Sequence, residues 1–163
     1  MPNAEETRKD DRDESFDEKM DRNWAELLQE LRVLQTGVQI LAGFLLTLPF
    51  QSRFETLDDF QVTLYLANVI LAALTTALIL LPVSTHRRLF RKGLKDTLVA
   101  SADRIAKVAL AGVALLSVGT SALVFDVTAG RAAGLTAGAA LLAVLLVLLV
   151  LIPNMLRHRA RQD

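Results

Sequence analysis

Cysteine is absent from the 163-residue chain, and histidine occurs only at His86 and His158. The lack of cysteine excludes disulfide bonds, thiolate chemistry and cysteine-ligated metal sites. Both histidines stand beside arginines, which disfavours metal binding at either position. The sequence also lacks zinc-ligand spacings, a phosphate-binding glycine loop and a nucleophile–base motif. We therefore predict no cofactor, no metal and no catalytic residue, and we expect that the chain is not an enzyme.

Charge is missing from four long stretches of the chain. These runs without Asp, Glu, Lys, Arg or His are Val33–Ser52, Phe60–Thr85, Val108–Phe125 and Ala132–Leu156. About 20 helical residues cross the hydrocarbon core of a bilayer, so each run is long enough to span it. A soluble fold of this size could not bury four such helices on all sides. The sequence predicts an all-α membrane protein, a four-helix transmembrane bundle.

The division of the chain follows from the same pattern. Residues 1–15 are charged and almost without large apolar side chains, which predicts a disordered tail. The transmembrane domain is expected to cover residues 16–163. The missing intramembrane charge also disfavours a proton-coupled carrier, because such carriers usually keep an acid or a histidine within the membrane.

The few charges between the runs predict the orientation. Four spans place both termini and the middle connector, 86–107, on one side. That side holds sixteen of the eighteen Lys and Arg residues. Basic residues in short loops stay cytoplasmic, so both termini are expected in the cytoplasm of a bacterial cell, with the protein in the plasma membrane.

The first and third helices are expected to extend beyond the membrane into the cytoplasm. Apolar residues recur at spacings of three and four from Trp24 through Leu31, Val38 and Leu45 to Leu48. This stripe crosses the predicted membrane boundary without interruption. It can pack on the protein's own helices, form a dimeric coiled coil, or lie on the bilayer surface.

Glycines mark a close-packing face at the start of the fourth run. Gly130, Gly134 and Gly138 are four residues apart, a spacing that lets two helix backbones approach closely. Their partner is either a second copy of the chain or the third run. The third run is itself rich in small residues, including Gly112 and Gly119.

Polar and basic residues supply the remaining candidates. Gln35, Thr36 and Gln39 lie near the cytoplasmic end of the first run, where they could line a polar cavity or bond between helices. A basic cluster follows His86 and could contact anionic phospholipids or the acidic tail. The cluster consists of Arg87, Arg88, Arg91, Lys92 and Lys95.

The connector between the first two runs, 53–59, is expected to face the outside. Pro49 can end the first helix, and Asp58 or Asp59 can cap the second. Arg53 is the only base in this connector and could pair with Glu55 or with the aspartates. Arg53, Asp58 and Asp59 either close a turn or contact a ligand or partner.

Three segments carry a family resemblance: "ELLQELRVLQTGVQILAGFLLTLPFQSRF", "LDDFQ" and "PVSTHRRLFRKGLK". With them the chain resembles a domain-of-unknown-function family of small four-span actinobacterial membrane proteins. The resemblance implies the architecture and the membrane location, and it implies no catalytic residues.

The predicted function is a non-enzymatic accessory, scaffold or lipid-interacting subunit of the plasma membrane. The alternative is a small oligomeric channel or carrier for a neutral or anionic solute. Expected partners are the bilayer, anionic phospholipids, and a second copy or another membrane protein, but not nucleic acid.

Overall fold

The computed structural model describes residues 16–89 and 95–159, and these residues are almost entirely helical. No strand occurs within them. In chain order the elements are α2 (Phe16–Thr47), the 3-10 turns η1 (Leu48–Phe50) and η2 (Ser52–Thr56), α3 (Asp59–Leu89), α4 (Lys95–Ala129), α5 (Arg131–Leu146), the π-helical turn η4 (Val147–Leu151) and α6 (Ile152–Arg159). The predicted all-α fold is confirmed. The predicted disordered tail lies outside the described residues.

Among the described residues, four helices are long and apolar enough to cross a membrane. They are Glu18–Phe50, Asp59–Pro82, Ala102–Ala129 and Arg131–Arg159. Both α2 and α4 begin well before the charge-free runs that predicted them. The helical period therefore continues into charged sequence in both cases, because apolar residues at spacings of three and four persist there.

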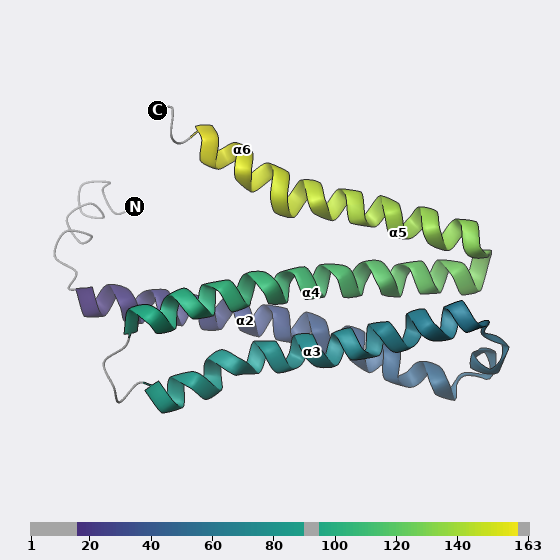
Figure 1. Ribbon diagram of the computed structural model, residues 1–163, viewed down its shortest axis with the longest axis horizontal. Helices are drawn as coiled ribbons and strands as arrows, with labels where there is room; N and C mark the ends of the chain where they lie inside the picture. The colour runs from purple at the N-terminus through teal and green to yellow at the C-terminus, as the bar shows by residue number, and fades with distance from the viewer. Residues whose placement is uncertain (1–15, 90–94, 160–163) are drawn as a thin grey trace, which may run out of the picture.

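Helices α2, α3 and α4 pack against one another and form the core (Figure 1). On α2 the core residues are seven apart: Leu31, Val38 and Leu45 are 3%, 1% and 0% exposed. Leu27, Leu34, Leu41 and Leu48 pack beside them. The stripe on the first helix therefore packs on the protein's own helices, which is the first of the three predicted alternatives.

Helix α5 packs against α4 and then diverges from it toward α6 (Figure 1). The π-helical turn η4 lies just before Pro153, and the Ile152 N–H donates to the Val147 carbonyl five residues back. Proline has no N–H to donate and its ring crowds the carbonyl four residues earlier. A locally widened turn relieves that crowding, which accounts for the position of η4.

The ends of the helices gather at two opposite ends of the molecule. The first residues of α2 and α4 and the last residues of α3 and α6 lie at one end, and the α2–α3 connector and the α4–α5 turn lie at the other (Figure 1). The even number of long helices predicts this arrangement.

Candidate functional site

Asp58 caps the start of α3. Its Oδ1 accepts a hydrogen bond from the Gln61 N–H at 2.9 Å, and the Gln61 Oε1 accepts one from the Asp58 N–H at 3.0 Å. Such a reciprocal pair satisfies two donors that the first turn of a helix leaves without partners. Of the two aspartates that could cap this helix, Asp58 is the one that does, and Asp59 is the first residue of α3.

Arg131 joins Asp58 to the other turn at the same end of the molecule. Its Nη2 lies 2.5 Å from Asp58 Oδ2, and its Nε lies 2.8 Å from Asp126 Oδ2. The Nε approach is off the hydrogen-bonding direction, so this second contact is an ion pair without a well-formed hydrogen bond. The Arg131 guanidinium also stacks over the ring of Phe60 at 3.8 Å, a cation–π contact.

Asp126 is the buried member of this group. Its side chain is 3% exposed, against 39% for that of Arg131, and its Oδ1 accepts a hydrogen bond from Gln61 Nε2 at 2.6 Å. A buried carboxylate needs partners for both oxygens, and Asp126 has one on each. We call Asp58, Gln61, Asp126 and Arg131 the polar clasp, because together they tie α3, α4 and α5 to each other.

The sequence did not predict Asp126 as a buried residue. The charge count placed it in a connector, 126–131, whereas α4 continues to Ala129. The turn after it is a single residue, Gly130, with φ +91°. That left-handed backbone is open to glycine and strained for other residues, so the chain reverses there without a longer loop.

Arg53 does not have the role that its sequence position suggested. Within the described residues it forms no ion pair, and Asp58 pairs with Arg131 from the other turn instead. The sequence left Arg53 open to pairing with Glu55 or with the aspartates, and none of these pairs is formed within the described residues.

Hydrogen bonding sets the acidity of Asp58. The Gln61 N–H and the nearby Arg131 guanidinium hold the pKa of this carboxyl below its ordinary value of 3.8. Both interactions favour the charged form. Asp58 is therefore ionised at any pH at which the protein is expected to work.

The clasp is the end of a longer polar seam between α3 and α4. Gln61, Asn68 and Thr75 are seven residues apart on α3, and they face Asp126, Gly119 and Gly112 on α4. A Cβ at Gly112 would lie 2.5 Å from Thr75 Oγ1, and one at Gly119 would overlap the Asn68 amide. These glycines therefore make room for polar side chains of α3. Asn68 Nδ2 also donates to the Leu64 carbonyl at 2.8 Å.

The predicted close-packing glycines divide into three groups. Gly134 and Gly138 are buried against α4, at Ala122 and Asp126. Gly112 and Gly119 face α3, not α5, so the expected pairing of the two small-residue faces is wrong for them. Gly130 is exposed with no atom near its Cβ position, so it forms the turn and does not pack.

The polar candidates in the second half of α2 do not face the core. Gln35, Thr36 and Gln39 are all exposed, and the Thr36 hydroxyl donates to the Arg32 carbonyl of its own helix at 3.0 Å. Of the basic cluster, Arg91 and Lys92 lie outside the described residues. The side chains of Arg87, Arg88 and Lys95 are outside the described part as well. The contacts predicted for the cluster remain predictions.

The arrangement at the clasp is suited to holding helices together. Its two carboxylates and one guanidinium are engaged with one another or with Gln61. Within residues 16–89 and 95–159, no three His, Cys, Asp or Glu side chains are grouped so that they could hold a metal ion.

Comparisons with known proteins place the chain in a family. No curated protein and no solved structure matches it. A family model described as "Family of unknown function (DUF6328)" matches residues 13–153, which is most of the chain. The sequence resemblance predicted a family of unknown function, and that prediction is confirmed. The chain belongs to the family of unknown function DUF6328.

Proposed function

We propose that the chain is a multi-pass protein of the bacterial plasma membrane with a non-enzymatic role, as an accessory, scaffold or lipid-interacting subunit. Both termini would be cytoplasmic. Four apolar helices support the membrane location. The large excess of basic residues on the side of the termini supports the orientation.

The observation that carries this proposal is the exposure of the last helix. From Ala139 to Arg159 every side chain is exposed except Leu141 and Leu145, which are half-buried. We call residues 139–159 the arm. The part of α5 before the arm is held against α4, because Arg131 belongs to the clasp and Gly134 packs on α4. The arm is apolar on all sides as far as Pro153, and most of its surface is left uncovered by the other helices. Such a surface is well suited to packing against a partner's transmembrane helix.

Site-specific photo-crosslinking in native membranes tests the accessory role. A photoreactive amino acid at Leu148, in the arm, is compared with one at Ile40, which is exposed on α2. The accessory role predicts one discrete protein product from residue 148 and none from residue 40. Equal crosslinking to lipid from both positions would remove the support that the arm gives to this role.

Cysteine labelling tests the orientation, and the cysteine-free chain gives a clean background. A single cysteine at Ser52 should react with a membrane-impermeant maleimide in intact spheroplasts. One at Lys107 should react only after permeabilisation. The reverse pattern would invert the proposed topology.

A second candidate function is an oligomeric channel or carrier for a neutral or anionic solute. It is favoured by the exposure of Gln35, Thr36 and Gln39 on the outer surface of α2, where several copies could bring them around a shared axis. Reconstituted protein should then conduct, and Gln39→Leu should reduce conductance. Protein without conductance or solute flux in liposomes would exclude this candidate.

A further inference from the structure

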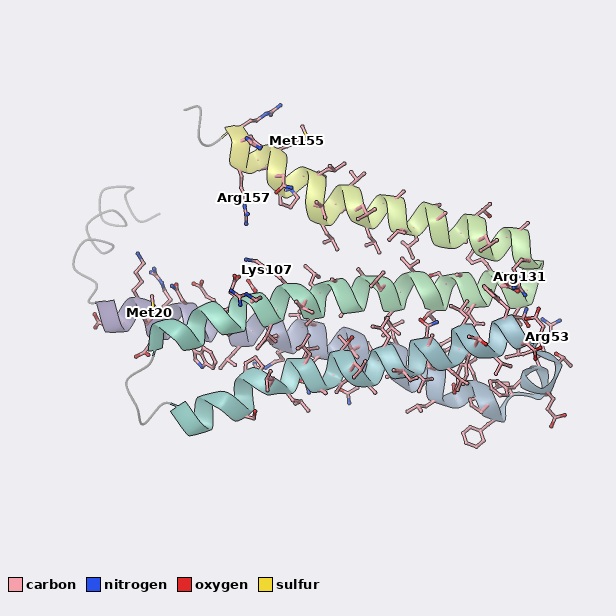
Figure 2. All side chains as sticks on the ribbon, in the orientation of Figure 1. Met20, Arg53, Lys107, Arg131, Met155 and Arg157 are labelled. Carbon is pink, nitrogen blue, oxygen red and sulfur yellow. The ribbon has the colours of Figure 1, made fainter. Side chains whose placement is uncertain are left out.

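Arg53 lies at the clasp end of the molecule, the end at which Arg131 also lies (Figure 2). A hollow beside the α2–α3 connector includes Arg53 in its lining. Its volume is about 380 Å³. It is lined by Phe44, Leu48, Gln51, Ser52, Arg53, Phe54, Leu57, Leu123, Val124, Val127 and Thr128. The end of α2, the two 3-10 turns and the last turns of α4 therefore form its walls.

The connector builds this hollow by ending α2 early. Pro49 lies at the start of η1, where its missing N–H is not needed and where the α-helix can end. The turns then fold back along the bundle, and Phe54 packs edge-to-face on Tyr65 of α3 with ring centroids 5.1 Å apart. Phe54 and its neighbour Arg53 both line the hollow.

The chemistry of the lining is that of an anionic amphiphile site. Most of its residues are apolar, and Arg53 is the only charged residue among them. The Thr128 hydroxyl already donates to the Val124 carbonyl at 2.7 Å, so it is engaged within its own helix. Asp58 is engaged by Arg131 and does not belong to the lining. Within the described residues, no carboxylate neutralises Arg53.

We infer that this hollow binds one acyl chain of an anionic phospholipid, with the lipid phosphate at Arg53. The inference rests on the proposed membrane location. Phe44 and Val124 are 45% and 38% exposed, so the hollow opens where α2 and α4 would face the bilayer and the ligand can enter from there. A guanidinium presents a planar set of donors that matches phosphate oxygens. The volume is at the small end of the range for ligand pockets, which fits a single chain.

A second hollow of about 400 Å³ provides an internal control. It lies between α2 and α3 and is lined by Leu45, Leu46 and Leu80 among others, with Thr76 as its only polar residue. It can hold an acyl chain, but it has no group that distinguishes one headgroup from another. Only the hollow at Arg53 should prefer anionic lipid.

Fluorescence quenching by brominated lipids tests the inference. The chain has one tryptophan, Trp24, which is replaced by phenylalanine. Tryptophan is then introduced at Phe44, in the Arg53 hollow, or at Leu46, in the control hollow. Each full-length protein is reconstituted with brominated phosphatidylglycerol or brominated phosphatidylcholine at equal mole fractions.

We expect the tryptophan at residue 44 to show about fivefold preference for phosphatidylglycerol, which corresponds to about 1 kcal/mol per base at a membrane surface. Arg53→Gln should abolish the preference. Arg104→Gln, which removes an exposed arginine outside the hollow, should retain it. The tryptophan at residue 46 should be quenched equally by both lipids.

Each other outcome is decisive. Equal quenching by both lipids at residue 44, or a preference that survives Arg53→Gln, would overturn the lipid site while leaving the membrane location intact. Absence of quenching at both residues would instead overturn the membrane location itself. The two failures are therefore distinguishable.

Discussion

Gly134→Ala tests whether close backbone contact holds α5 on α4. A Cβ at residue 134 would lie 2.6 Å from Asp126 Cβ and 2.7 Å from the Ala122 carbonyl oxygen. Non-bonded carbon atoms rest about 3.5–4.0 Å apart, so α5 must move away from α4 by about 1 Å at this point. The opposing atoms are at the backbone or next to it, so no change of rotamer relieves the clash.

The expected loss of stability combines two opposing effects. Overpacking of this kind costs about 1–3 kcal/mol, whereas alanine favours a helix over glycine by about 1 kcal/mol. We expect Gly134→Ala to reduce the free energy of unfolding by about 1–2 kcal/mol. The displacement should also weaken the contact of Arg131 with Asp126, because both residues lie at the same turn.

Two further glycines provide a graded control series. A Cβ at Gly138 would lie 3.1 Å from the Ala122 methyl group, so Gly138→Ala should cost less than Gly134→Ala. Gly43 has no atom within 4 Å of its Cβ position, so Gly43→Ala should leave stability unchanged or raise it.

Unfolding in mixed micelles with increasing dodecyl sulfate, followed by far-ultraviolet circular dichroism, measures all three variants. Gly134→Ala should be the least stable of them. If Gly134→Ala were as stable as Gly43→Ala, α5 would not be held at this distance from α4, and the close-contact argument would fail.

Three other predictions concern the seam and the clasp, and the same unfolding measurement checks them. Arg131→Gln should lower the free energy of unfolding by about 2–3 kcal/mol, because it leaves the buried Asp126 carboxylate without its cation. Adding Asp126→Asn to that variant should restore most of the loss. Additive losses in the double variant would show that the two residues are not coupled. Gly119→Ala should destabilise the protein, because the added methyl group meets the Asn68 amide. Adding Asn68→Ala should recover part of the lost stability. A double variant no more stable than Gly119→Ala alone would contradict this contact. The folded-state pKa of Asp58 is lowered, so its stabilisation is complete above the ordinary value of 3.8 and is lost as the pH falls through the lowered pKa. Wild type should therefore exceed Asp58→Asn in stability near neutral pH and converge with it in acid, and a difference independent of pH would refute this.

Local pattern was sufficient to predict several parts of the site. An aspartate just before an apolar run predicted a cap at Asp58 or Asp59, and Asp58 provides it. The packing of Gly134 follows from small residues four apart. The inward face of α2 follows from the recurrence of Leu31, Val38 and Leu45. In each case the informative signal is local, because spacing within a helix fixes which of its residues share a face.

Contacts between distant segments were not predictable in this way. Gln61 meets Asp126 across 65 residues, and Arg131 meets Asp58 across 73. Gln61, Asn68 and Thr75 are seven residues apart, but this spacing does not indicate which residues of α4 oppose them. That depends on the register of two antiparallel helices, which the whole interface sets.

The four helices, the inward face of α2 and the start of α3 follow from the amino-acid sequence, because they arise from the helical period and from capping within one turn. The pairing of Asp58 with Arg131 instead of Arg53, the burial of Asp126 and the divergence of the arm emerge only from the packed bundle. Charge pairing and burial depend on which side chains converge at one end of the bundle. That convergence follows from how the helices are packed and from the single-residue turn at Gly130.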